Sequence, residues 1–395
     1  MLLAIFIAVV CYSPIIETFV PSTNFGAGIP DLGPVRLGIY LLSLVFIIHI
    51  AIAHKIRFNR FFAILAAFYL IVLASVSWSN YSYRTSTLQE FFGTVFIPLF
   101  VALVSINLFT QEHNKKSYIR HIVIASVILA VMSIFQTIVA ILTQQEAFRA
   151  RGTFGNANSL AIFLILTIPC ILYALENRFF PRILGWVILF SVFIGTICTV
   201  SRKGIATMAL CFILFSLLKK KYKQIAIFLY VFALLAGLFS GYVFFSKRFD
   251  VSELQHHFQQ KWNMTVAGWR MFQTSPIAGL GYKGYYDNYG KFCLDAWRDK
   301  YDAHNIFITA LANYGLLGFL PFMGIFMYPL IISIRTIRRE ESLVSTDYSR
   351  DWAIVCICSI IPFMINGWFA GGLFYSTVEV SLLYINIMLF LCGKS

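Results

Sequence analysis

Four cations in short polar segments between apolar stretches, and one in a long polar segment, suit the binding of a negatively charged substrate. They are Arg149, Arg151, Arg202, Lys203 and Arg270. Arginine binds phosphate oxygens through paired hydrogen bonds and keeps its charge in almost any environment. Arg202 is the strongest candidate, because a cation in a one-turn connection between two apolar helices is costly unless an anion pairs with it. We predict an anion-binding site, while contact with phospholipid headgroups stays open for any one of these residues.

A histidine at the start of a long apolar stretch is the candidate for proton transfer. His304 lies in the segment Asp302-Ala-His-Asn305, directly before that stretch. A neutral imidazole near pH 7 can accept a proton from a hydroxyl group. We therefore predict a general base at His304, with an ordinary helix-terminal histidine as the alternative.

The elements that must position these residues are membrane helices. The chain has 395 residues, of which 59% are hydrophobic and only 12% are charged, and its mean hydropathy is +0.78. Soluble domains carry about 25% charged residues, so this composition excludes a soluble globule. About twelve apolar stretches are long enough to cross a bilayer. We predict an all-α polytopic membrane protein with one membrane domain over residues 1–395 and one large loop, 246–303, between spans nine and ten.

The positions of lysine and arginine predict which side of the membrane each loop faces. The formal net charge is +14, and most of the cations fall in alternate loops. Cytoplasmic loops carry such an excess, so we expect both termini in the cytoplasm and the 246–303 loop outside. The basic surplus is then a matter of topology, and we predict no nucleic-acid partner. The candidate residues named above all fall on the outer side, within reach of membrane lipids.

The large loop has a helical pattern of its own. Apolar residues recur at helical spacing before Pro276, namely Leu254, Phe258, Trp262, Val266 and Trp269. We expect this stripe to pack on the membrane domain, with Arg270 beside it. Gly279-Leu-Gly-Tyr-Lys-Gly284 matches a nucleotide-binding pattern in its letters, but no strand precedes it, so we interpret it as a turn.

The residue types that are missing also narrow the function. The acidic residues of the outer side are scattered, and no D-x-D or H-E-x-x-H pattern is present, so we predict no metal site and no cofactor. No phosphate-binding loop for ATP is present. Any chemistry on the outer face must therefore use a substrate that is already activated.

Four motifs, taken in order, resemble the O-antigen ligase/polymerase family of bacterial envelope glycosyltransferases. The resemblance covers about residues 151 to 318. The motifs are Arg151-Gly-Thr-Phe-Gly-Asn-Ala-Asn158, Thr199-Val-Ser-Arg-Lys-Gly204, Gly268-Trp-Arg270 followed by Ser275-Pro-Ile-Ala-Gly-Leu-Gly281, and His304-Asn305 followed by Tyr314-Gly-Leu-Leu-Gly318.

This resemblance implies a fold, a location and a substrate. It implies a GT-C-like helical membrane fold in the bacterial inner membrane, with the active site on the periplasmic face. The donor would be a glycan linked to undecaprenyl pyrophosphate, which agrees with the outer cations and with the absence of an ATP site. Transfer would invert the anomeric carbon and need no metal.

The resemblance also implies residue roles. Arg202 and Arg270 would clamp the pyrophosphate and stabilise the leaving group. His304 would deprotonate the acceptor hydroxyl, and Asn305 or Asp302 would orient the imidazole. Further phosphate or sugar contacts would come from Lys203 and Arg151.

The acceptor separates two functions within the family. A ligase moves the finished glycan onto lipid A-core, whereas a polymerase joins it to another lipid-linked repeat unit. Both functions need the same donor site and the same base, so we favour the ligase only by a small margin. A transporter or flippase is a more distant alternative, since it would place charged or broken helices at the bilayer midplane. A non-catalytic scaffold of the cell envelope is the last of the alternatives.

Overall fold

The computed structural model describes eight segments of the chain. They are residues 57–79, 92–145, 148–154, 156–223, 251–293, 303–340, 348–369 and 377–392, besides single positions elsewhere. All regular secondary structure in these segments is helical. The prediction of an all-α protein is confirmed for this part of the chain.

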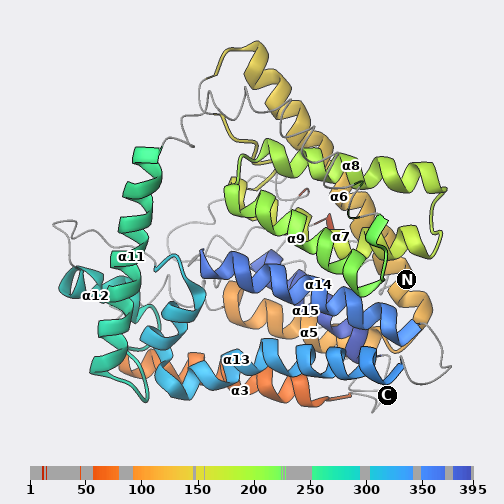
Figure 1. Ribbon diagram of the computed structural model, residues 1–395. Helices are drawn as coiled ribbons and strands as arrows, with labels where there is room; N and C mark the ends of the chain where they lie inside the picture. Colours follow the sequence, from red (N-terminus) through yellow and green to blue (C-terminus); the bar gives the residue numbers. More distant parts are fainter. Residues whose placement is uncertain are drawn as a thin grey trace.

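Eleven α-helices and two short helical turns make up the described structure (Figure 1). The helices are α3 (Arg60–Ala74), α5 (Ile97–Leu108), α6 (Glu112–Leu142), α7 (Ala157–Glu176), α8 (Arg182–Cys198), α9 (Arg202–Leu218), α11 (Val251–Thr274), α12 (Gly284–Phe292), α13 (Ile306–Glu340), α14 (Tyr348–Trp368) and α15 (Thr377–Leu391). The turns are Ser75–Trp78 after α3 and Phe92–Phe96 before α5.

Several of these helices have the length and composition of membrane spans. Five segments are long and apolar enough to cross a bilayer, namely Arg60–Trp78, Glu112–Leu142, Ala157–Glu176, Ile306–Arg339 and Ser349–Trp368. Three shorter apolar segments accompany them, namely Thr94–Leu108, Arg182–Cys198 and Val378–Leu391. Such a set of helices is that of an integral membrane protein. The total of twelve spans stays a prediction, since three of the predicted spans, near residues 1–20, 35–53 and 224–245, lie almost wholly outside the described residues.

The bundle is organised around α7 and α14. Helix α7 contacts α6, α8, α9, α14 and α15, while α14 contacts α7, α9, α13 and α15. Helices α3 and α13 lie side by side along one edge of the bundle, and α15 packs on α5 (Figure 1). Helix α7 is buried along nearly its whole length and is apolar on all sides, as expected for a helix surrounded by other helices.

A buried asparagine joins four helices in the bundle interior. The side-chain amide of Asn386 on α15 donates to the carbonyl of Leu166 on α7 (2.9 Å) and to the hydroxyl of Ser359 on α14 (3.0 Å). Its carbonyl oxygen accepts from the hydroxyl of Tyr118 on α6 (3.4 Å). Polar side chains between membrane helices favour association, because lipid offers them no hydrogen-bonding partner.

Replacement of Asn386 by alanine is expected to destabilise the bundle by about 1 kcal/mol, since it leaves four groups without this partner, the thiol of Cys170 included. Thermal unfolding of the purified protein in detergent measures the effect as a lower Tm. Gln273→Ala, at an exposed position of α11, is the control. An unchanged Tm for Asn386→Ala would show that the hydrogen bonds contribute nothing net.

The predicted packing face of the loop helix α11 is wrong. The expected stripe is exposed, with 71% of Phe258, 56% of Trp262 and 47% of Trp269 accessible. The face that packs against neighbouring elements instead carries Met264, Ala267 and Met271. Small residues decide the matter, because Ala267 and Gly268 allow close approach that bulky aromatic side chains prevent.

Gly268 marks the point where α11 crosses α13. A Cβ atom built on Gly268 would lie 2.2 Å from Cγ2 of Ile308, which is closer than any side chain tolerates. Figure 1 shows α11 at one end of the bundle, running across the direction of α13. This contact therefore sets both the position of α11 and its rotation about its own axis.

The turn after α11 is bound to α13 through its backbone. The amides of Leu280 and Gly281 donate to the carbonyls of Ala312 (2.9 Å) and Asn313 (2.8 Å), and Leu316 N donates to Pro276 O (2.8 Å). These bonds are possible because α13 has a non-helical residue at Gly315 (φ +57°). The glycine-rich run 279–284 contains a turn, as interpreted from the sequence, and the structure adds that this turn docks on α13.

Candidate functional site

The first two motifs of the sequence are hydrogen-bonded to each other. Arg149 donates from Nε to the carbonyl of Thr199 (3.0 Å) and from Nη2 to Oδ1 of Asn158 (2.9 Å). The same Asn158 oxygen accepts from the hydroxyl of Ser201 (3.0 Å). Arg149 therefore holds the loop before α7 against the turn before α9, and its guanidinium is partly committed to structure.

The segment of Arg151 is held by a single side chain of α6. Gln136 Oε1 accepts from the amides of Arg151 (3.1 Å) and Gly152 (2.9 Å), and Gln136 Nε2 donates to Gly152 O (2.8 Å). Gly152 has a φ of +57°, where a side chain would be strained. The backbone is thus fixed, while the side chain of Arg151 is exposed.

Arg202 and Lys203 form the first turn of α9. Ser201 caps this helix, because its hydroxyl accepts from the amide of Gly204 (3.3 Å). Both cations are half-buried. The free amides at a helix N-terminus favour anions and disfavour cations, so two cations in this turn are best accommodated when an anion is bound.

His304 is held in the connection that leads into α13. Its φ is +49°, in the left-handed region. The next residue, Asn305, is buried and accepts through Oδ1 from the amides of Phe307 (2.9 Å) and Ile308 (3.2 Å). Asn305 thus caps α13 and fixes the backbone next to His304. Asp302, the other predicted partner of the imidazole, lies outside the described residues.

Two lysines lie close to the same residue, Phe369, which directly follows α14. Lys203 Nζ donates to the carbonyl of Phe369 (3.5 Å), and Lys261 Nζ of α11 lies 5.9 Å from the centre of the Phe369 ring. Three elements far apart in the sequence therefore meet here, namely the start of α9, the middle of α11 and the end of α14. The imidazole of His304 is within electrostatic range of both lysines.

The surroundings keep His304 neutral. Partial desolvation lowers the pKa of His304 below its ordinary value of 6.5, and the positive charges of Lys261 and Lys203 lower it further. Desolvation, followed by the charge of Arg202, likewise lowers the pKa of Lys261. The imidazole is consequently in its unprotonated form near pH 7, which is the form that accepts a proton.

The segment that contains these cations and His304 matches a known protein family. Residues 184–323 match the model of the O-antigen ligase family, Wzy_C. This match supports the assignment of this part of the chain to the O-antigen ligase/polymerase family. No curated protein matches the chain. The resemblance predicted from the four motifs is confirmed, and the matched segment contains Arg202, Lys203, Lys261, Arg270 and His304.

Within this O-antigen ligase segment, Arg270 is separated from the other cations. Arg270 and Lys261 are nine residues apart on α11, which at about 100° per residue puts them on roughly opposite sides of the helix. Lys261 is directed to Phe369, whereas Arg270 is exposed and has no described contact with Arg202, Lys203 or His304. The structure groups Arg202, Lys203 and His304, and it leaves Arg270 and Arg151 apart from them.

Lys261 is the member of the group that the sequence analysis missed. It belongs to none of the four motifs, and lysines are common in polar loops. A signal was nevertheless present, because Lys261 precedes Gly268 by seven residues, which is about two helical turns. The two residues share one side of α11, and Gly268 marks the side that approaches α13.

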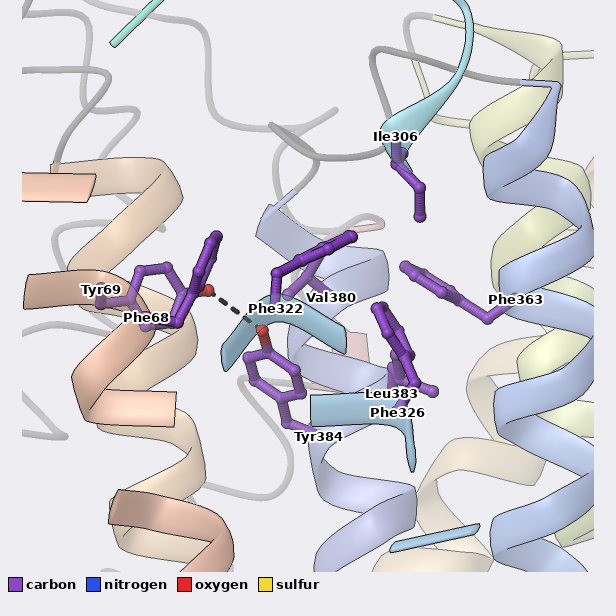
Figure 2. Close-up of a pocket in the computed structure, with 9 residues that line it drawn as sticks. All are labelled: Phe68, Tyr69, Ile306, Phe322, Phe326, Phe363, Val380, Leu383 and Tyr384. Atoms are coloured by element: carbon purple, nitrogen blue, oxygen red, sulfur yellow. Dashed lines mark hydrogen bonds between the residues drawn. The ribbon is translucent and has the colours of Figure 1, made fainter. Parts of the chain in front are cut away.

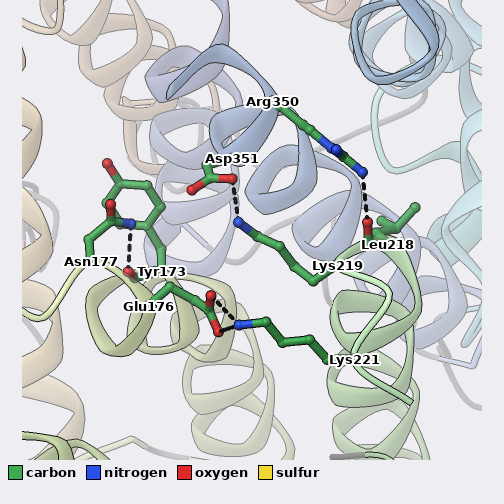
Figure 3. A network of polar contacts seen from close by, with 8 residues as sticks. All are labelled: Tyr173, Glu176, Asn177, Leu218, Lys219, Lys221, Arg350 and Asp351. Carbon is green, nitrogen blue, oxygen red and sulfur yellow. Dashed lines mark hydrogen bonds and ion pairs between the residues drawn. The ribbon is translucent and has the colours of Figure 1, made fainter. Parts of the chain in front are cut away.

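At the opposite end of α9, two lysines form ion pairs with carboxylates of neighbouring helices (Figure 3). There Lys219 pairs with Asp351 of α14, and Lys221 pairs with both oxygens of Glu176 of α7. In the part of the chain that the structure describes, no carboxylate pairs with Lys203 or Lys261. Two of the lysines at this end of the helix therefore have carboxylate partners, which Lys203 and Lys261 lack in the described segments.

An apolar pocket is lined in part by Ile306, the first residue of α13 and two positions after His304 (Figure 2). Aromatic and aliphatic side chains of α3, α13, α14 and α15 surround it, and Ile306 is among them. The hydroxyls of Tyr69 and Tyr384 are hydrogen-bonded to each other beside it (3.2 Å). The charged site therefore adjoins an apolar hollow in the bundle.

Proposed function

We propose that this protein is an O-antigen ligase-type glycosyltransferase that moves a glycan from undecaprenyl pyrophosphate to a sugar hydroxyl of lipid A-core. The observation that carries the proposal is the group of cations around the neutral imidazole of His304. A phosphate-rich donor suits the cations, and a hydroxyl acceptor suits the imidazole. The family of residues 184–323 agrees with both.

On the donor side, the cations bind and stabilise the pyrophosphate. Arg202 and Lys203 contact its oxygens from the start of α9, where the helix amides add to their positive potential. Arg270 and Arg151 are exposed and serve as further phosphate or sugar contacts. These charges stabilise the leaving group as the bond between the anomeric carbon and the phosphate oxygen breaks.

On the acceptor side, His304 is the general base. Its unprotonated imidazole takes the proton of the acceptor hydroxyl, and the oxygen attacks the anomeric carbon from the side opposite the pyrophosphate. The new glycosidic bond therefore has inverted configuration, and undecaprenyl pyrophosphate departs. Asn305 holds the backbone of His304 through its cap on α13, and Asp302 is the remaining candidate to orient the ring.

The reaction has a defined place in the cell. We assign the protein to the bacterial inner membrane, with both termini in the cytoplasm and the site on the periplasmic face. The basic residues at the Lys219 end of α9 support this orientation, since cytoplasmic loops carry such an excess. The reaction uses no metal and no cofactor, so added chelator should leave turnover intact.

Reconstitution with defined substrates tests the proposal. The purified protein is incubated with undecaprenyl-pyrophosphate-linked glycan and lipid A-core, and both lipid products are separated. Glycan on lipid A-core with inverted linkage is the expected result. Elongated glycan that stays on undecaprenyl pyrophosphate would show a polymerase instead. No transfer to either acceptor by a folded protein would overturn the assignment as a glycosyltransferase.

A further inference from the structure

We propose that Lys261 is a third phosphate-binding cation of this site, supplied by α11 and acting on the donor beside Arg202 and Lys203. The inference rests on the proposed function, because it takes the pyrophosphate donor as the ligand. It adds a residue from outside the four motifs, and it assigns to Lys261 the place on α11 that the motifs suggest for Arg270.

The first step of the argument is the shared contact with Phe369. Lys203 Nζ donates to its carbonyl, and Lys261 Nζ stands over its ring at 5.9 Å from the ring centre. The ammonium groups of two helices are thereby held near the same residue. In the described segments neither has a carboxylate partner, so a bound anion would relieve their mutual repulsion.

The second step is that packing fixes the direction of Lys261. The close contact of Gly268 with Ile308 determines the rotation of α11 about its axis. Met264 and Met271 are fully buried on the packed face of the helix, and Tyr285 adds a hydrogen bond from its hydroxyl to the carbonyl of Met264 (2.8 Å). Lys261 is one turn before Met264 on this anchored helix, so its position does not depend on a loose loop.

The third step links Lys261 to the base. The cations whose charges act on His304 in the described structure are Lys261 of α11 and Lys203 of α9, and each lowers the pKa of the imidazole. A bound pyrophosphate compensates these positive charges, so the pKa of His304 rises toward its ordinary value. His304 then becomes a stronger base when the donor is in place, which couples donor binding to proton transfer.

Two readouts with one matched set of variants test the proposal. The variants of the full chain are Lys261→Met, Lys261→Arg, Lys291→Met and Arg202→Ala. Lys291 is an exposed lysine of α12 and serves as the control. Binding of farnesyl pyrophosphate to the purified protein is measured by calorimetry, with farnesol as the uncharged reference. The pH profile of kcat/KM for glycan transfer is the second readout, because it reports the pKa of the base in the free enzyme.

Lys261→Met is expected to weaken farnesyl pyrophosphate binding about tenfold, the size of one lost charge-assisted contact. It should also move the acidic limb of the kcat/KM profile to higher pH, since one charge that lowers the pKa of His304 is gone. Lys261→Arg should restore most of the binding, and Lys291→Met should change neither readout. A purely structural role for Lys261 would leave the acidic limb in place.

Failure of this inference is distinct from failure of the proposed function. If Arg202→Ala weakens binding while Lys261→Met alters neither binding nor the pH profile, Lys261 is not part of the site and the donor assignment stands. If the unmodified protein binds farnesyl pyrophosphate no better than farnesol, both the proposed pyrophosphate site and this inference are wrong.

Discussion

Replacement of His304 by alanine is expected to lower glycan transfer by about 10²- to 10⁴-fold, the usual contribution of a positioned general base. The donor-binding cations remain, so farnesyl pyrophosphate should still bind. Turnover of purified protein with lipid-linked glycan measures the loss. Because the unprotonated imidazole is the active form, kcat/KM of the unmodified enzyme should fall as pH drops through the pKa of His304. The lowered pKa places that fall below pH 6.5.

The backbone at His304 requires a second variant. Its φ of +49° suits asparagine better than alanine, since asparagine visits the left-handed region readily. His304→Asn therefore keeps the connection while removing the basic ring, and it should be as inactive as His304→Ala. His113→Ala, at an exposed position near the start of α6, is the control for loss of an imidazole. Near-normal transfer by His304→Asn would remove His304 as the base.

Replacement of Arg202 by alanine is expected to lower kcat by about 10²- to 10³-fold, because the leaving pyrophosphate loses a preorganised positive group. Arg202→Lys keeps the charge but loses the two-pronged hydrogen bonding of the guanidinium, so donor binding should still weaken. Single-turnover kinetics and farnesyl pyrophosphate binding separate the effect on chemistry from the effect on affinity.

A matched arginine exists at the other end of the neighbouring helix. Arg182 is the first residue of α8, as Arg202 is of α9, but the two lie at opposite ends of the α8–α9 hairpin. Arg182→Ala should retain full activity and should control for loss of an arginine from a helix start. If both Arg202 variants bind the donor and turn over normally, Arg202 has a structural role only.

The helical class was accessible from sequence, and so was the choice of candidate site residues. Apolar stretches of sufficient length predict helices because a bilayer leaves no other way to satisfy the backbone, and nine of the predicted spans coincide with described helices. The segment around His304 was equally accessible, because a histidine and an asparagine before an apolar run indicate a capped helix start. The caps at Ser201 and Asn305 have this form.

The packing face of α11 could not be predicted from the sequence. The stripe of Phe258, Trp262 and Trp269 has the periodicity of a buried face, yet these side chains are exposed. Hydrophobic periodicity identifies a buried face only where water is the alternative. In a membrane protein, lipid and the interfacial region also accommodate aromatic side chains, so helices associate through small residues instead.

The amino-acid sequence by itself predicted a helical membrane protein that resembles the O-antigen ligase/polymerase family, and it named a set of cations and one histidine as candidate site residues. Composition, charge placement and the order of four motifs are local properties, so no coordinates were needed for them. Only the tertiary structure decided which cations meet. Lys261 lies over the ring of Phe369, whose carbonyl accepts from Lys203, while Arg270 lies on the far side of α11, because the contact of Gly268 with Ile308 sets the rotation of that helix.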